Sequence, residues 1–268
     1  KKMMAATTPP ASDSDAASLW RSKGRELSTA QALHAELKGL IPDALEHTGA
    51  HAFDAHLTGV EGVVRSWVVD EDLALGALFH SIYGTEGFQG FSLPMTDRPR
   101  VRRLIGERAE RISWLFCCVD RRTFDRACLG CDDLSIGAVS SKPGDPRRRD
   151  LKARPELGAF ALDNTEDEFL DLCLLFLADI LEQIEGMAAK PNVEYNFQPL
   201  DAWGYRRFAY AAMRDILVAE RHLVVAEQMY RAVFDKEPKD HPKNCVPVTP
   251  PITDAARRAR IALESKAL

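Results

Sequence analysis

The chain has 268 residues and a net charge of −5, and it is 46% hydrophobic and 28% charged. A chain of this length can bury a sizeable core without disulfides or structural metal, and this composition is ordinary for a globular protein. The negative net charge argues against a general nucleic-acid binder, and no apolar run reaches the length of a membrane span. We therefore expect a globular protein with no nucleic-acid partner and no membrane span.

The N-terminal residues 1–17 are rich in Ala, Ser and Thr, and this composition predicts a disordered leader. They lack the continuous apolar segment that a secretory signal peptide contains. We therefore expect a cytoplasmic protein, or an organelle-matrix protein if the leader is the remnant of a transit peptide.

Helical periodicity dominates the rest of the chain, because apolar residues recur at helical spacing in one segment after another. Loops are expected at 85–99, which is rich in Gly and Pro, and near 131–165, where an insertion interrupts the helices. Acidic residues favour the start of the helix before the first loop, and Gly84 is a plausible end for it. In chain order, we expect helices over 18–45 (one or two), 51–68, 70–84, 100–130, 166–187, 203–219, 219–236 and 253–266.

The predicted fold class is all-α, because no segment shows the alternating pattern of a strand. After the leader, we expect one helical domain over 18–200 with the insertion inside it, followed by a C-terminal helical extension over 201–268 packed on the core. Aromatic and methionine side chains of the extension leave two alternatives open, a surface for a protein partner or simple packing on the core. These side chains are Tyr205, Phe208, Tyr210, Met213, Tyr230 and Phe234.

Four cysteines cluster in the sequence, at Cys117, Cys118, Cys128 and Cys131, and the last two have C-x-x-C spacing. A zinc site normally needs a second well-spaced pair, and adjacent residues on a helix point in different directions. Buried free thiols are therefore the expected state of these residues.

Two histidines and one aspartate can meet in such a bundle. His56 lies on one expected helix and His80 lies at the end of the next, and a short connection makes these helices antiparallel neighbours. Asp179 lies within an apolar run of a third helix, where a buried carboxylate needs an ion, a cation or several donors. Two imidazoles and a carboxylate form a reasonable ligand set for a transition metal. For either histidine taken singly, the alternative is an ordinary histidine with a local hydrogen bond.

Short motifs in this order resemble the HD-domain superfamily, and specifically the hydrolase domain of RelA/SpoT-type alarmone enzymes. The resemblance spans about residues 50–187 and implies an HD-like helical bundle with extra N- and C-terminal helices. It also implies that His56, His80 and Asp179 are metal ligands of a phosphohydrolase. The motifs that carry it are His56 on a helix, "ALFHSIYGT" (77–85), "IGERAERISWLF" (105–116) and "FLADILEQ" (176–183).

The sequence departs from that family around His80. Ser81 stands where an aspartate ligand would follow the histidine, Tyr83 and Gly84 replace a Glu-Asp pair, and Gln183 replaces an Asn. A serine hydroxyl is a weak ligand for a divalent metal compared with a carboxylate. The resemblance therefore implies either one divalent ion, Mn or Fe, on the three remaining ligands, or a degenerate site with no metal.

The sequence also resembles an uncharacterised domain family with H-L-x-G-V and F-H-S-x-Y-G-T-E motifs. The corresponding segments are "HLTGV" (56–60) and "FHSIYGTE" (79–86). In such a family the serine after the histidine belongs to a distinct branch. This second resemblance implies no activity.

Further residues are candidates for chemistry beside the metal. Glu86 follows a glycine turn that could fold it back as a ligand or base, and its alternative is an exposed loop carboxylate. Tyr83 could orient a substrate through its hydroxyl, although packing of its ring is the simpler role. Cationic side chains could bind a phosphate substrate, but a solvated basic face explains them equally well. These cationic residues are Arg98, Arg100, Arg102, Arg103 and the run 147–149. Among them, Arg102 and Arg103 are the candidates for substrate binding.

Three functions remain open from the sequence. The first is a mononuclear metal-dependent hydrolase of a phosphorylated small molecule. The second, a variant of the first, is an HD-like iron oxygenase. The third is a catalytically degenerate HD fold that serves as a structural or binding subunit of a larger complex and has a protein as its partner.

Overall fold

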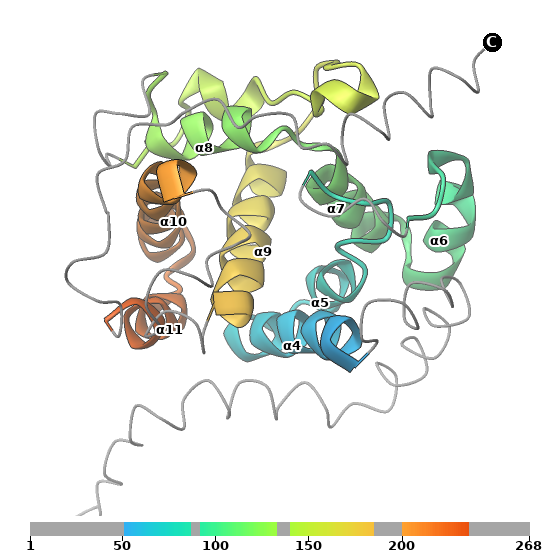
Figure 1. The fold of residues 1–268 in the computed structure, drawn as a ribbon, viewed down its shortest axis with the longest axis horizontal. Helices are drawn as coiled ribbons and strands as arrows, with labels where there is room; N and C mark the ends of the chain where they lie inside the picture. The colour runs from blue at the N-terminus through green and yellow to red at the C-terminus, as the bar shows by residue number, and fades with distance from the viewer. Residues whose placement is uncertain (1–50, 87–91, 133–139, 185–199, 236–268) are drawn as a thin grey trace, which may run out of the picture.

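A computed structural model of the chain describes residues 51–86, 92–132, 140–184 and 200–235. Within these ranges the chain forms eight α-helices and no β-strand, which confirms the all-α fold class. The expected leader and the helices expected over 18–45 and 253–266 lie outside the described residues. The helices (Figure 1) are α4 (His51–Trp67), α5 (Glu71–Leu78), α6 (Arg98–Ile105), α7 (Glu107–Cys118), α8 (Arg121–Leu129), α9 (Glu166–Ile184), α10 (Leu200–Arg221) and α11 (Val224–Phe234).

Helix α9 is the centre of the arrangement. It packs against α4, α5 and α7 on one side and against α10 and α11 on the other (Figure 1). Every residue from 169 to 181 is buried, as expected for a helix that is apolar nearly all round. Phe176 stacks on Phe116 of α7 with ring centroids 4.2 Å apart and packs on Phe124 of α8 at 4.6 Å. Each such buried side chain stabilises the fold by about 1.5–3 kcal/mol.

Helix α5 begins as the sequence predicts but ends earlier. The Asp70 side chain caps its N-terminus by accepting a hydrogen bond from the Leu73 N–H at 3.1 Å. The helix was expected to continue to Gly84, but it ends at Leu78, and the next residues form tight turns closed by a 2.9 Å hydrogen bond from Gly84 N–H to the Ser81 carbonyl. His80 therefore lies in a buried turn after the helix, and not on the helix itself.

The helical stretch expected over 100–130 is divided into α6, α7 and α8. Gly106 separates the first two helices with a φ of 90°, a conformation that side-chain-bearing residues rarely adopt. Asp120 separates the next two, because its carboxylate accepts hydrogen bonds from the N–H groups of Arg122 and Thr123 and so begins α8.

Residues 140–165 hold no α-helix. They form 3₁₀ turns at Pro146–Arg149 and Pro155–Leu157, and two isolated antiparallel bridges hold the segment to the end of α7 and to itself. Arg148 within the basic run is fully buried and binds the carboxylates of Glu166 and Glu220. A solvated basic face, one of the two alternatives for this run, is therefore wrong for Arg148, because its charge is compensated inside the fold.

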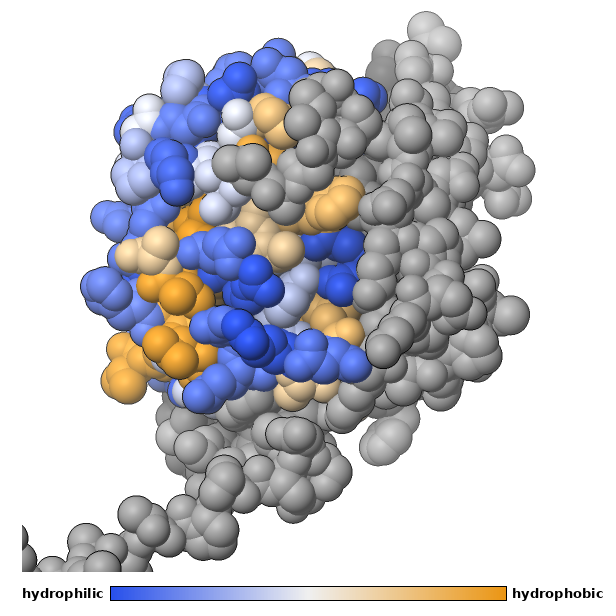
Figure 2. Space-filling view, turned by 90° about the vertical axis from the view of Figure 1, so that its left-hand side faces the viewer, coloured by the Kyte–Doolittle hydropathy of each residue, from blue (hydrophilic) through white to orange (hydrophobic). Residues whose placement is uncertain are grey.

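Helices α10 and α11 pack on the core through the side chains for which a partner surface was considered. Tyr210, Met213, Tyr230 and Phe234 are buried in the main core cluster, and Phe208 is partly buried against it, whereas the side chain of Tyr205 lies outside the described residues. Where the face over these helices is coloured in Figure 2, hydrophilic residues cover most of it, and the largest group of hydrophobic residues lies at the lower left. Among the described residues, no helix has the length and apolar character needed to cross a membrane.

Candidate metal centre

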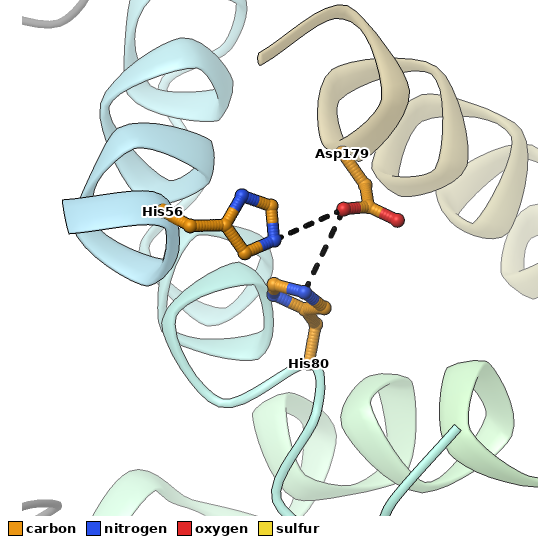
Figure 3. A group of neighbouring side chains, drawn as sticks. All are labelled: His56, His80 and Asp179. Carbon is orange, nitrogen blue, oxygen red and sulfur yellow. Dashed lines mark ion pairs between the residues drawn. The ribbon is translucent and has the colours of Figure 1, made fainter. Parts of the chain in front are cut away.

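Three elements bring His56, His80 and Asp179 together (Figure 3). Helix α4 carries the first histidine, the turn after α5 the second, and the C-terminal half of α9 the aspartate. His56 Nε2 lies 3.2 Å from Asp179 Oδ1, and His80 Nε2 lies 3.7 Å from the same oxygen. One potential ligand atom from each of the three residues lies within 4.8 Å of the others. The structure thus places these three sequence-predicted residues in one group.

A backbone contact sets the orientation of His80. Its Nδ1 lies 2.7 Å from the carbonyl oxygen of Ala77, one of the last carbonyls of α5. A carbonyl can only accept, so Nδ1 carries the proton and Nε2 of the neutral ring has a free lone pair. The Phe116 ring packs edge-on against the imidazole at 5.1 Å and completes the buried position of the ring. The early end of α5 therefore directs Nε2 of His80 toward Asp179.

Glu182 has the corresponding role for His56, and it was not among the residues predicted from the sequence. Its Oε2 lies 2.6 Å from His56 Nδ1, which directs His56 Nε2 toward Asp179. Metal-binding histidines usually donate their second ring N–H to a carboxylate or a backbone carbonyl, and both histidines here have such a partner. The spacing of Glu182 from Asp179 could have indicated this role. Glu182 comes three residues after Asp179, and residues three apart on a helix lie on the same face as neighbours.

Gln183, which stands where the resembled family has an Asn, lies beside the same carboxylate. Its Nε2 is 2.5 Å from Asp179 Oδ1 and 3.5 Å from His56 Nε2. The amide therefore donates to the aspartate and fixes its position on α9.

The three groups differ in charge because their surroundings differ. Burial lowers the pKa of His80 to about 4, so its imidazole is neutral at pH 7. Burial also acts to lower the pKa of His56, but hydrogen bonds to Asp179 and Glu182 outweigh it and raise that pKa to about 9. Burial acts to raise the pKa of Asp179, yet the hydrogen bond from His56 and nearby positive charges bring it down to about 2. Asp179 is therefore a carboxylate at neutral pH, as a metal ligand must be.

The donor set and its spacing fit a divalent transition metal. Imidazole and carboxylate ligands bind such an ion at about 2.0–2.2 Å, which puts neighbouring ligand atoms about 3.0–3.6 Å apart. The nitrogen-to-oxygen distance of 3.2 Å lies within this range and the distance of 3.7 Å lies just above it, so a small shift of the side chains would bring the ligands to an ion. Three protein ligands leave further positions for water or substrate.

The other residues of the His80 turn have different partners. Ser81 is buried, and its carbonyl accepts the hydrogen bond from Gly84. Tyr83 donates its hydroxyl to Glu110 of α7 at 2.9 Å and not to the three-residue group. Glu86 accepts a hydrogen bond from the backbone N–H of Arg121 at 2.9 Å, at the N-terminus of α8. The structure thus does not bring Tyr83 or Glu86 into the group.

The two arginines chosen as phosphate contacts also lie apart from the group. Arg102 donates to Glu110 at 2.8 Å, and Arg98 binds the same carboxylate at 2.6 Å. Arg103 is exposed on α6. The described cysteines are free thiols and four of the five are buried, with Cys128 closest to Cys173 at 3.9 Å between the sulfurs.

Comparison with known proteins gives one match. A family model described as a domain of unknown function (DUF6817) matches residues 36–121, about a third of the chain. The matched residues include both histidines and the motifs at 56–60 and 79–86, but not Asp179. No curated protein and no solved structure matches the chain significantly. The description of the family gives no activity, so a function has to be argued from the site.

Proposed function

We propose that this protein is a divergent HD-like hydrolase that holds one divalent metal ion at His56, His80 and Asp179 and acts on a phosphorylated small molecule. The observation that carries the proposal is the orientation of the two imidazoles. Each has its Nδ1 bound to an acceptor, and each directs Nε2 toward the same oxygen of a buried carboxylate. The assignment to the HD-domain superfamily is part of this proposal and rests on the order of the motifs.

The residues of the chain would prepare the site in separate ways. A bound divalent ion supplies a water of lowered pKa, which can attack a phosphoester at neutral pH. Glu182 and the Ala77 carbonyl hold the imidazoles so that both Nε2 atoms converge. His56 is protonated at pH 7 without an ion, so binding an ion there would release its Nε2 proton. Gln183 holds the carboxylate of Asp179 in place through its 2.5 Å contact. The apolar surroundings of His80 keep its ring neutral and able to bind the ion.

A second candidate is an iron oxygenase. Two histidines and one carboxylate with open positions form the ligand set that non-haem Fe(II) oxygenases use. The same three residues would then hold Fe(II), with Mn(II) or another divalent ion in the hydrolase.

The remaining alternative is a degenerate site. Asp179, His56, Glu182 and Gln183 already satisfy one another through hydrogen bonds, so the group can stand without an ion. The protein would then serve as a structural or binding subunit with a protein partner.

Metal content separates these functions. We expect purified wild-type protein to contain about one equivalent of a divalent metal by elemental analysis, and His80→Ala to contain almost none. A matched control is His222→Asn, because His222 is exposed and has a φ of 56° that Asn tolerates. This control should keep its metal. Far-ultraviolet circular dichroism checks that each variant is folded.

The identity of the metal then selects the assay. If the metal is manganese or zinc, the assay is the release of phosphate from phosphate esters and nucleotides. If the metal is iron, the assay is oxygen consumption. Metal-free wild-type protein whose melting temperature is unchanged by added Mn(II) or Fe(II) would leave the degenerate subunit as the function. A ligand at a hundred times its Kd should stabilise the fold by about 2.7 kcal/mol, which a thermal melt detects easily.

A further inference from the structure

A buried arginine near the His80 turn has no compensating carboxylate among the described residues. Arg154 is only 4% exposed, and its Nε has no hydrogen-bond partner. Its Nη1 reaches the Thr85 carbonyl at 3.5 Å, the outer limit of a hydrogen bond. Within the described ranges, no carboxylate forms an ion pair with this guanidinium. Burial of a cation is costly unless an anion or several acceptors compensate it, so the position calls for an anionic ligand.

The chain brings Arg154 beside the end of α7. Its backbone N–H donates to the Cys118 carbonyl at 2.7 Å, and the next pair, Val119 and Ala153, forms an antiparallel bridge. This pairing places residue 154 opposite Cys118, the last residue of α7. Arg121, the first residue of α8, contacts the same segment after His80, because its backbone N–H donates to Glu86, the residue that follows Thr85.

Arg121 lies over the aromatic residues that pack against the candidate metal centre. Its guanidinium carbon is 3.8 Å from the ring centroid of Phe176 and 4.7 Å from that of Phe116. The Phe116 ring in turn contacts His80. Arg121 is half-buried, so part of its side chain remains accessible to solvent.

Both arginines act on the same side of the His80 turn. Burial raises the pKa of the Cys117 thiol to about 12, and the positive charges of Arg154 and Arg121 oppose this rise. The Cys117 sulfur lies 3.0 Å from the His80 carbonyl oxygen. The charge of Arg121 also acts on His80 and Asp179 themselves. Arg154 thus contacts the backbone five residues after His80, and Arg121 lies over the Phe116 ring that packs on the His80 imidazole.

We propose that Arg154 and Arg121 form a phosphoryl-binding subsite beside the metal centre. A guanidinium presents its N–H groups in a planar fork that matches the oxygens of a phosphoryl group. Two cations suit a phosphoryl group, which carries nearly two negative charges at neutral pH, better than a carboxylate with one. The nearby Glu86 binds the backbone N–H of Arg121 at the start of α8. The inference deepens the proposed function, since the assignment of the phosphoryl group to a substrate rests on it.

Calorimetric titration of inorganic phosphate into metal-free protein, prepared with a chelator, tests the subsite. Wild-type protein should bind phosphate, and Arg154→Met and Arg121→Met should each bind it about tenfold more weakly or worse. Arg149→Met is the matched control, because Arg149 is exposed in the same loop, and it should bind as wild type does. Acetate, which offers a single carboxylate, should bind at least tenfold more weakly than phosphate.

Three results would overturn the inference: no phosphate binding by wild type, equal binding by wild type and Arg154→Met, or acetate binding as strong as phosphate binding. Phosphate should also raise the melting temperature of wild type and leave that of Arg154→Met unchanged. If Arg154→Met does not fold, Arg154→Lys and Arg121→Met decide by the same titration. Because the titration contains no metal, a failed subsite leaves the metal content unaffected, and a metal-free wild type leaves the phosphate result unaffected.

Discussion

The negatively charged carboxylate of Glu110 is fully buried in the core, where the side chains of three residues donate hydrogen bonds to it. Arg98 and Arg102 of α6 donate to its two oxygens at 2.6–3.0 Å, and the Tyr83 hydroxyl donates to it at 2.9 Å. The charge is therefore stable only while these donors are in place. Tyr83 and Arg102, which the sequence suggested for substrate contacts, thus have a clear role in holding α6 and the His80 turn against α7.

The pH dependence of stability should reveal this carboxylate. Burial acts to raise the pKa of Glu110, but its hydrogen bonds to the two arginines and to Tyr83 outweigh it and lower the pKa below the usual 4.5. Such a group contributes stability above its unfolded-state pKa, and the contribution is lost as pH falls through the folded-state pKa. We expect Glu110→Gln to lower the free energy of unfolding by about 1.5–3 kcal/mol at pH 7, and by progressively less below about pH 4.5. Urea unfolding from pH 3 to pH 7 measures this.

A matched control is Glu107→Gln, because Glu107 is exposed at the start of the same helix. It should change the free energy of unfolding by about 0.5 kcal/mol or less at every pH. A difference between wild type and Glu110→Gln that stayed constant from pH 3 to pH 7 would contradict the role given to this carboxylate.

At the scale of elements, α4 and α9 approach each other closely at Gly59. A Cβ at this position would lie 2.6 Å from Oε1 of Glu182, the side chain that holds His56. The far end of a glutamate can move, whereas the backbone of two packed helices cannot. The glycine thus gives Glu182 the room to reach Nδ1 of His56.

Gly59→Ala should therefore separate stability from metal binding. The free energy of unfolding of the metal-free protein should stay near that of wild type, since alanine favours a helix by about 1 kcal/mol over glycine. Metal affinity, measured by competition with a chelator, should fall about 10–100-fold because Glu182 is displaced from His56. The pKa of His56 in the metal-free protein, followed by NMR, should fall below its wild-type value of about 9.

Gly76→Ala is the contrasting variant. A Cβ there would meet Ile112 Cγ2 at 3.0 Å and the Ala109 carbonyl oxygen at 3.3 Å, both in the buried contact between α5 and α7. We expect it to destabilise the fold by about 1–3 kcal/mol and to leave the pKa of His56 unchanged. An unaltered His56 pKa in Gly59→Ala would show that Glu182 does not depend on this glycine.

The elements show which features a sequence can predict. Helix order and the meeting of His56 with His80 follow from local periodicity and from a short connection, so they were predictable. The end of α5 was not, because the turn at His80 depends on local hydrogen bonds rather than on periodicity. Glu182 and Glu110 were also missed, since their partners come from other helices and only the packed structure brings them together.

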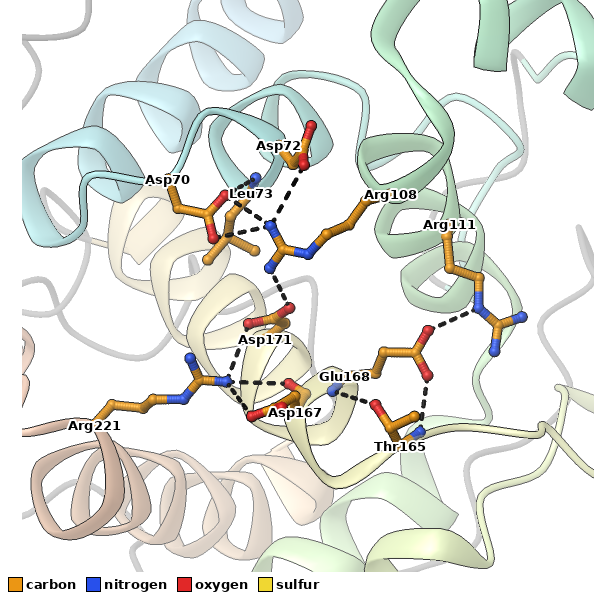
Figure 4. Close-up of polar contacts among 10 residues, drawn as sticks. All are labelled: Asp70, Asp72, Leu73, Arg108, Arg111, Thr165, Asp167, Glu168, Asp171 and Arg221. Carbon is orange, nitrogen blue, oxygen red and sulfur yellow. Dashed lines mark hydrogen bonds and ion pairs between the residues drawn. The ribbon is translucent and has the colours of Figure 1, made fainter.

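Across the whole molecule, a chain of ion pairs links four helices (Figure 4). Arg108 of α7 binds Asp70 before α5 at 2.8 Å and Asp171 of α9 at 2.8 Å, and Arg221 of α10 reaches Asp171 at 3.5 Å. The pair of Arg108 with Asp70 is largely exposed, and such pairs contribute only about 0–1 kcal/mol each. Asp171 is buried, so Arg108 and Arg221 compensate a charge that would be costly inside the fold without them.

Arg148 forms a second network of ion pairs, in which the cation is buried and not exposed. It is fully buried and donates to Glu166 at the start of α9, to Glu220 near the end of α10, and to Ser141 in the preceding loop. Its guanidinium also lies 5.0 Å from the ring centroid of Phe169. The residue thus ties residues 140–165 to the two longest helices of the described fold.

Substitution of Arg148 and of Arg154, two buried arginines of the same loop, should have opposite effects on stability. Arg148 binds two carboxylates, whereas Arg154 binds none among the described residues. Arg148→Met leaves Glu166 and Glu220 without their cation, and we expect a loss of about 3–5 kcal/mol in the free energy of unfolding. Arg154→Met removes an uncompensated charge and should cause no loss in phosphate-free buffer. Urea denaturation of both variants, with Arg149→Met as the exposed control, measures the contrast. Equal destabilisation by the two substitutions would mean that Arg154 has a compensating partner after all, and the phosphoryl subsite would lose its main support.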